Sequence, residues 1–202
     1  MDRVAVFVDN GYMKKIQDRL RIRINYLTFS SAIAGGEENR FRTYVYDCPP
    51  YQSSPPTKDE SERKGAFDSF RYNITRLSRF EFRTGRLQIV RDESGRIMRK
   101  PGGYPELRQK GIDMALGIDM TSLSAGNKIH KAVLVAGDSD FLPAVLFAKQ
   151  AGVLVSLYYD PGTYVHDSLY EACDDRLELT KELLKKFRRE PAPKTLKTKK
   201  PF

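Results

Sequence analysis

Short apolar runs alternate with longer helical segments along this chain, and the alternation predicts its secondary structure. Val4 to Val8 is a continuous apolar run rich in β-branched residues, which is typical of a buried strand. Further strands are predicted over 41–46, 82–90, 132–136 and 153–158. Helices are predicted over 12–20, 60–80, 110–124, 141–150 and 180–188, while 26–34 is ambiguous and suits a short helix. Apolar strands that alternate with helices predict an α/β fold, a mostly parallel sheet with helices on both faces.

Length and composition are consistent with one folded domain. The 202 residues include 40% hydrophobic residues, enough to bury a core, and we place the domain at 1–184 and a basic, disordered tail at 185–202. No apolar run approaches the roughly 18 residues that span a bilayer, and the N-terminus lacks the plan of a signal peptide. Cys48 and Cys173 lack the spacing of a disulfide framework or a zinc site. We therefore expect a cytoplasmic protein without membrane contact.

The net charge of +9 is divided unevenly along the chain. Residues 63–110 carry a net +8 and residues 185–202 a net +7, whereas residues 111–184 carry a net −6. A basic surface beside an acidic centre fits phosphate binding next to a cation site. A solvated mixture of charges explains the same division equally well, so the charges alone do not decide the function.

Three aspartates directly follow predicted strands. Asp9 ends the first apolar run, and Asp138 and Asp140 follow the strand at 132–136. Because ligands collect at the carboxyl ends of parallel strands, all three are expected at one edge of the sheet. Taken alone, Asp9 is better explained as the N-cap of the next helix. One member of the second pair is also expected to cap a helix, but a cap does not require two carboxylates, so the pair favours a hard cation.

A fourth aspartate, Asp113, lies in an otherwise apolar helical segment, where an unpaired buried carboxylate would be costly. It is therefore expected to bind a metal or another partner, unless it faces solvent. Lys110, three residues earlier, is a candidate partner for a helical ion pair. Asp119 lies about 120° from Asp113 around the helix, so both cannot face one ion. Asp119 is therefore assigned a supporting role.

The chain contains three motifs in a fixed order: Phe7-Val8-Asp9-Asn10-Gly11, Lys110-Gly111-Ile112-Asp113 continuing to Met120, and Val135-Ala136-Gly137-Asp138-Ser139-Asp140-Phe141-Leu142-Pro143. Each motif is weak alone, but the ordered set resembles the NYN domain, also called the LabA-like or DUF88 family. The resemblance covers most of residues 3 to 175. It implies a Rossmann-like, PIN-like three-layer fold and a nuclease that cleaves RNA with Mg²⁺ or Mn²⁺.

The resemblance also implies roles for single residues. The catalytic residues and metal ligands would be Asp9, Asp113, Asp138 and Asp140. The supporting residues would be Asn10, Asp119, Ser139 and Lys110.

Substrate positioning is assigned to the arginine-rich middle of the chain. The expected contacts are Arg76, Arg79, Arg83, Arg86, Arg96, Arg99 and Lys100. Single-stranded RNA is the expected partner, internal cleavage is favoured over terminal cleavage, and self-association is left open.

Two other classes of function are compatible with the same residues. One is a regulatory or RNA-binding module whose acidic site does not cut. The other is a metal-dependent enzyme that acts on nucleotides, because Asp138-Ser139-Asp140 after a strand also fits a cation site of that kind. Against the second alternative, the chain has no GxxxxGK loop and no GxGxxG motif.

Overall fold

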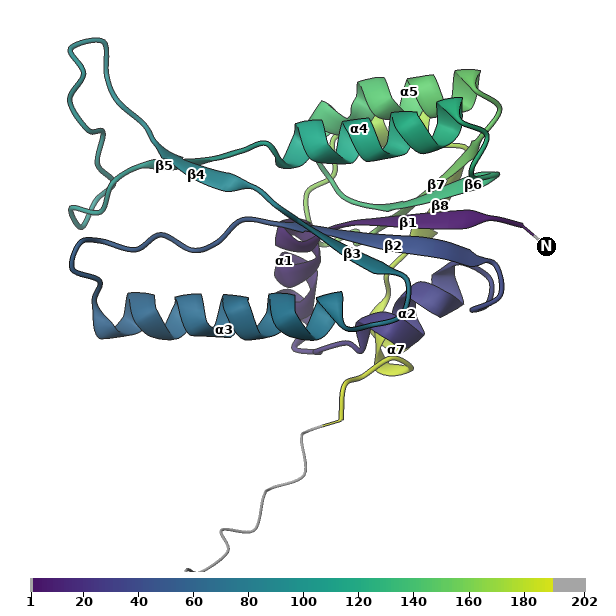
Figure 1. Cartoon of the computed structure of the whole chain (residues 1–202), viewed down its shortest axis with the longest axis horizontal. Helices are drawn as coiled ribbons and strands as arrows, with labels where there is room; N and C mark the ends of the chain where they lie inside the picture. Colours follow the sequence, from purple (N-terminus) through teal and green to yellow (C-terminus); the bar gives the residue numbers. More distant parts are fainter. Residues whose placement is uncertain (1, 191–202) are drawn as a thin grey trace, which may run out of the picture.

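A six-stranded parallel sheet forms the centre of the protein (Figure 1). The structure is a computed structural model and describes residues 2–190. Its strands are β1 (Val4–Asp9), β2 (Arg40–Asp47), β3 (Phe80–Thr84), β6 (Lys131–Val135), β7 (Leu154–Tyr159) and β8 (Asp175–Glu178). Their order in the sheet is β3-β2-β1-β6-β7-β8, and every neighbouring pair is parallel. In the two central strands, residues 4–8 of β1 and 132–135 of β6 are apolar and buried because both faces of the sheet are covered.

Helices cover the two faces of the sheet in two groups (Figure 1). On one face lie α1 (Asn10–Leu20), α2 (Tyr26–Ile33), α3 (Lys58–Thr75) and α7 (Lys181–Lys185). On the other lie α4 (Ile112–Ala125), α5 (Leu142–Gln150), which follows the 3-10 turn η1 (Ser139–Phe141), and α6 (Asp167–Ala172). Alternate residues of β1 serve the two resulting cores: Phe7 packs on the α4 side and Val8 on the α1 side. The predicted three-layer α/β fold is confirmed.

Several predicted boundaries are wrong in the middle of the chain. The segment 82–90 was expected to be one strand, but it divides at Gly85 into β3 and β4 (Arg86–Ile89). A Cβ at Gly85 would lie 2.5 Å from Cys48 Sγ and 2.8 Å from Ile112, so close packing explains the glycine at this division. The helix expected over 60–80 ends at Thr75, and β8 and α6 were not predicted.

Residues 86–110 form an arm that projects from the body of the protein (Figure 1). Its base is the antiparallel pair of β4 and β5 (Leu107–Lys110), and the bridges Arg91–Ile97 and Arg99–Pro105 continue the pairing outward. Lys110 therefore ends a strand of the arm and does not begin α4, as the sequence had indicated.

The folded domain continues beyond residue 184, where we had placed its boundary. The backbone N–H of Asn25 donates to the Phe187 carbonyl, and that of Arg189 donates to the Arg23 carbonyl, each at 2.7 Å. Phe187 packs edge-on against Phe29. The remainder of the predicted tail, 191–202, lies outside the described residues. None of the described helices has the length and apolar character needed to cross a membrane.

The start of α3 generates a prediction about acid stability. Glu60 accepts hydrogen bonds from the Ser53 hydroxyl and from the backbone N–H groups of Ser53 (3.0 Å) and Thr57 (2.9 Å). These bonds lower the pKa of Glu60 from 4.5 to about 2. Because the folded pKa is the lower one, the stabilisation is complete above pH 4.5 and is lost as the pH falls towards 2. We predict that Glu60→Gln flattens the loss of unfolding free energy across this window.

Urea unfolding at a series of pH values measures this dependence. Glu62→Gln, an exposed carboxylate on the same helix, is the matched control and should retain the wild-type slope. Identical pH dependence for wild type and Glu60→Gln would contradict the prediction.

Candidate functional site

The carboxyl ends of β1, β2 and β6 lie side by side at one edge of the sheet. The chain runs outward from β1 through β2 to β3, and then from β6 through β7 to β8 in the opposite direction. The boundary between β1 and β6 is therefore a topological switch point, where open α/β sheets bind their ligands. Asp9 ends β1, Asp47 ends β2, and Asp138 follows β6 by three residues.

Asp9 caps α1, which agrees with the structural role considered for it. Its Oδ1 accepts hydrogen bonds from the backbone N–H groups of Gly11 (2.8 Å) and Tyr12 (3.2 Å). Burial raises the pKa of Asp9 to about 6, and the nearby carboxylate of Asp47 adds to the increase. Both hydrogen bonds use Oδ1, so the cap leaves the second oxygen available to another ligand.

Asp47 is a member of this edge that the sequence analysis missed. Its side chain is only 5% exposed, and it accepts hydrogen bonds from Asn10 Nδ2 (2.7 Å) and Lys14 Nζ (2.6 Å). Asn10 is fully buried, and its Oδ1 also accepts a hydrogen bond from the Tyr26 hydroxyl. The sequence marks Asp47 as an acidic residue directly after the aromatic strand predicted over 41–46, and this strand includes Asp47 in the structure. Asn10 thus has a clear role: it ties the carboxyl end of β2 to the first turn of α1.

Asp138 and Asp140 lie on the turn that leads into η1 and α5. Asp138 caps η1 through a bond from the Asp140 backbone N–H to its Oδ1 (3.2 Å), and Ser139 lies between them, half-buried. Both carboxylates are exposed. Pro143 lies in the first turn of α5, as expected. One of the two aspartates therefore caps, and the cap leaves the carboxylate of Asp140 unused.

The first turn of α4 brings Asp113 towards this pair. Burial raises the pKa of Asp113, and the negative charges of Asp140 and Asp138 raise it further, in that order. Lys110 at the end of β5 opposes this effect, but it forms no ion pair with Asp113 within the described residues. Three carboxylates from two separate motifs are therefore close enough to repel one another.

Asp119 faces away from this group, in agreement with the helix geometry. Its carboxylate accepts two bonds from the Arg83 guanidinium (2.9 and 3.2 Å) and one from the Tyr46 hydroxyl (2.9 Å). These contacts fasten α4 to β2 and β3. Arg83, which we had assigned to RNA, is held by the same bonds.

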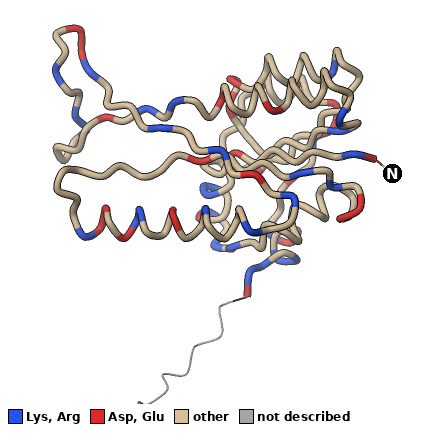
Figure 2. Tube along the Cα trace, viewed as in Figure 1, with Lys and Arg blue, Asp and Glu red and all other residues tan. Residues whose placement is uncertain are grey.

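The predicted nucleic-acid contacts fall into three groups. Arg79 and Arg83 are engaged inside the domain, Arg79 with the Arg40 carbonyl and with Glu37. Arg76 lies at the end of α3 with its guanidinium over the Tyr72 ring, 4.9 Å from the centroid. The remaining residues are exposed on the arm, where Figure 2 shows a series of basic positions: Arg86, Arg96, Arg99 and Lys100.

Within residues 2–190, no group of three or more Asp, Glu, His or Cys side chains is arranged to hold a metal ion. The donor chemistry nevertheless suits a hard divalent cation, because the converging side chains are all carboxylates and those of Asp113, Asp138 and Asp140 repel one another. The four-aspartate metal site therefore stays a prediction.

A second buried carboxylate, Asp160, follows β7 at the same edge. Burial opposes its ionisation, but hydrogen bonds from Arg19 and Thr163 keep its pKa below the ordinary value. The Tyr12 hydroxyl accepts a bond from its backbone N–H (3.2 Å). These contacts hold the segment after β7 against α1, and they position Tyr164 above the turn at Gly137.

The packing at Gly137 generates a prediction. A Cβ there would lie 2.5 Å from the Tyr164 carbonyl oxygen and 2.6 Å from the Tyr12 ring. We expect Gly137→Ala to lower the unfolding free energy by about 1–3 kcal/mol, since backbone and a buried ring would have to move. Gly117→Ala in α4 is the matched control, because its Cβ would meet only Ala144 at 4.0 Å. It should be neutral or stabilising by up to about 1 kcal/mol; a loss equal to that of Gly137→Ala in denaturant unfolding would refute this explanation.

Comparisons with known proteins agree with this architecture. No match is found among curated proteins. A crystal structure of a protein of unknown function from Vibrio parahaemolyticus is similar, with a TM-score of 0.59 and 16% identity over 89% of this chain and 93% of that chain. At that identity, the similarity concerns the fold. The sequence profile of the NYN domain matches residues 3–180, and the chain therefore belongs to the NYN domain family of the PIN-like superfamily, whose members are generally nucleases.

Proposed function

We propose that this NYN domain is a metal-dependent ribonuclease that cuts single-stranded RNA internally. The observation that supports it best is the convergence of Asp113 with Asp138 and Asp140: burial raises the pKa of Asp113, and the negative charges of Asp140 and Asp138 raise it further. A cation shared by these three carboxylates would offset their repulsion. Asp9, at the adjacent strand end, extends the acidic edge across the switch point.

The residues that would hold Mg²⁺ or Mn²⁺ are Asp9, Asp113, Asp138 and Asp140. A bound divalent cation supplies charge neutralisation at the phosphate and lowers the pKa of a coordinated water. The chain itself keeps these carboxylates in place with backbone bonds: caps fix Asp9 and Asp138, and Gly137 allows the turn to pack under Tyr164. Asn10 and Ser139 lie beside the ligands as supporting residues.

The positions of the two histidines support metal-dependent chemistry over a histidine acid/base pair. His130 accepts a bond from the Arg3 backbone at the amino end of β6, the opposite edge of the sheet. The Nδ1 of His166 caps α6 and contacts the Ser168 hydroxyl at 2.8 Å. The two rings therefore lie at opposite ends of the domain and cannot act on one phosphodiester.

An RNA-binding module that does not cut is the second candidate. It is favoured by one observation, the lack of a ready arrangement of three metal-binding side chains in the described part of the chain. The two candidates differ in whether cleavage of labelled RNA requires a divalent cation and the aspartates.

Asp138→Asn tests the proposal, because the amide keeps the size and the cap acceptor but removes the negative charge. We expect kcat on labelled single-stranded RNA with Mn²⁺ to fall by about a hundredfold or more, which corresponds to about 2.7 kcal/mol of barrier. EDTA should abolish cleavage by wild type. Asp59→Asn, an exposed aspartate on α3, is the matched control and should cleave like wild type.

Two results would count against catalysis at this edge. Equal cleavage by wild type and Asp138→Asn would remove Asp138 from the reaction. No cleavage by wild type with either metal, together with RNA binding in EDTA, would favour the module that does not cut.

A further inference from the structure

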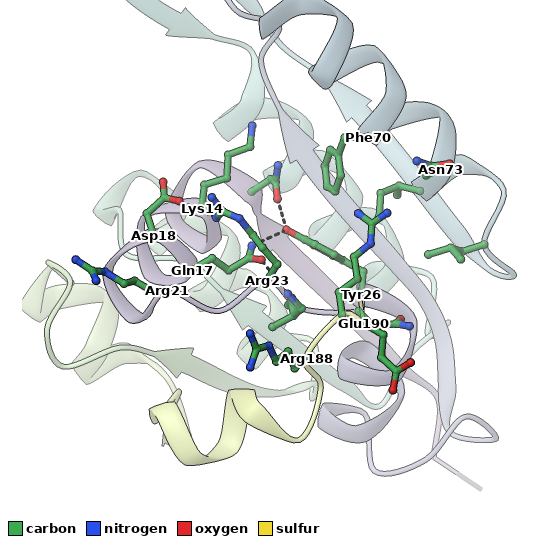
Figure 3. A pocket seen from close by; sticks show the side chains of 16 residues that line it. Lys14, Gln17, Asp18, Arg21, Arg23, Tyr26, Phe70, Asn73, Arg188 and Glu190 are labelled. Carbon is green, nitrogen blue, oxygen red and sulfur yellow. Dashed lines mark hydrogen bonds and ion pairs between the residues drawn. The ribbon is translucent and has the colours of Figure 1, made fainter. Parts of the chain in front are cut away.

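A cavity of about 820 Å³ lies outside the sheet, bounded by α1, the start of α2, the end of α3 and the C-terminal segment 188–190. Figure 3 shows Gln17, Arg23 and Tyr26 close together at the centre of this region, while Arg21 and Glu190 lie at its margins and point outward. None of the four proposed metal ligands lines this cavity, so it is a separate feature of the domain.

The cavity is connected to the acidic edge through two residues of α1. Asn10 and Lys14 line it, and both bind the Asp47 carboxylate at the carboxyl end of β2. Asn10 directly follows Asp9 in the chain. The cavity thus begins beside the proposed metal ligands and continues along α1 towards Arg188.

The rim of the cavity is strongly basic. Five cationic side chains line it, namely Lys14, Arg21, Arg23, Arg188 and Arg189, against the carboxylates of Asp18 and Glu190. Lys14 is paired with Asp47 and Arg23 with Asp18. Among the described residues, no ion pair engages the other three arginines. Three guanidinium groups at one opening are an arrangement suited to phosphate groups.

The inner wall of the cavity combines apolar and hydrogen-bonding groups. Ile24 and Ile74 are buried, and Phe70 is half-buried beside them. Tyr26 packs edge-on against Phe70, with 5.3 Å between the two ring centroids. Asn73 is exposed at the same wall, where its side-chain amide can both donate and accept hydrogen bonds. An apolar wall with a few polar groups under a basic rim suits a nucleobase with its phosphates outside.

We propose that this cavity holds the part of a single-stranded RNA next to the scissile phosphate, with its phosphates at Arg21, Arg188 and Arg189 and a base against the wall at Phe70. The inference rests on the proposed ribonuclease function and adds the path of the substrate. It also assigns Arg188 and Arg189 to the substrate site of the domain.

Binding in EDTA tests the cavity independently of cleavage. The probe is a fluorescein-labelled single-stranded RNA of roughly 12 nucleotides, and fluorescence anisotropy is measured at several salt concentrations. We expect Arg188→Glu to raise Kd by about tenfold or more and to reduce the salt slope by about one to two. Lys128→Glu is the matched control, since it makes the same change in net charge at an exposed site at the opposite edge of the sheet, and it should change Kd by less than about twofold.

A second variant guards against local misfolding. Arg188→Ala/Arg189→Ala removes the guanidinium groups but leaves the backbone bonds of this segment to Arg23 and Asn25, so it should fold and bind weakly. An equal effect of Arg188→Glu and Lys128→Glu would overturn the proposal, because the loss would then follow net charge. Binding of AMP without binding of the RNA would also overturn it.

Cleavage kinetics separate this inference from the proposed function. With Mn²⁺, Arg188→Glu should raise KM and leave kcat near wild type, whereas Asp138→Asn should lower kcat and retain binding in EDTA. If wild type cleaves the RNA but Arg188→Glu binds it as tightly as wild type does, the proposed RNA site in the cavity is overturned and the ribonuclease function is not. A wild type that binds through Arg188 but never cuts would support the cavity and reject the ribonuclease.

Discussion

Both proposed sites depend on the hydrogen bonds that the buried carboxylate of Asp47 accepts from α1. An isolated carboxylate that is 5% exposed would be strongly disfavoured, and Asn10, Lys14 and the Cys48 backbone N–H compensate for the lost water. Two of these partners belong to the first turns of α1. The bonds therefore fix the start of α1, and with it Asp9, against the end of β2. They also place Asn10 and Lys14 at the mouth of the basic cavity.

The acidic edge and the basic surfaces of the domain are separate, and the ion pairs among the described residues do not neutralise either of them. Two of the predicted RNA contacts, Arg79 and Arg83, are engaged within the domain instead, and Arg83 binds Asp119 and joins α4 to the sheet. Within residues 2–190, no ion pair engages Asp9, Asp113, Asp138 or Asp140. Burial raises the pKa of Asp113, and the charges of Asp140 and Asp138 raise it further. An unneutralised acidic edge beside unpaired arginines is what metal-dependent phosphate chemistry needs, since the cation and the substrate carry opposite charges.

The parts of the fold that could be predicted from sequence are those whose patterns are local. Val4–Val8 and 132–136 are apolar throughout because both faces of a central strand are buried, and the aspartates that follow them could be assigned to one edge. The strand β8 could not be predicted, because all four of its residues are exposed and no apolar pattern marks it. The division at Gly85 depends on Cys48 and Ile112, which are distant in sequence, and Asp47 was missed because strand ends are uncertain by a residue or two.

The basic cavity shows why charge along the chain is a poor guide to charge in space. Counted by position, Arg188 and Arg189 belong with the basic tail, and Arg21 belongs to residues 1–62, which carry no net charge. The fold brings them together, because the backbone of 187–189 pairs with that of 23–25 after the chain has crossed the whole sheet. Such a cluster cannot be found from any window of the sequence. It exists only because long-range backbone bonds bring like charges together, and like charges held in this way are best explained by a phosphate-bearing ligand that neutralises them.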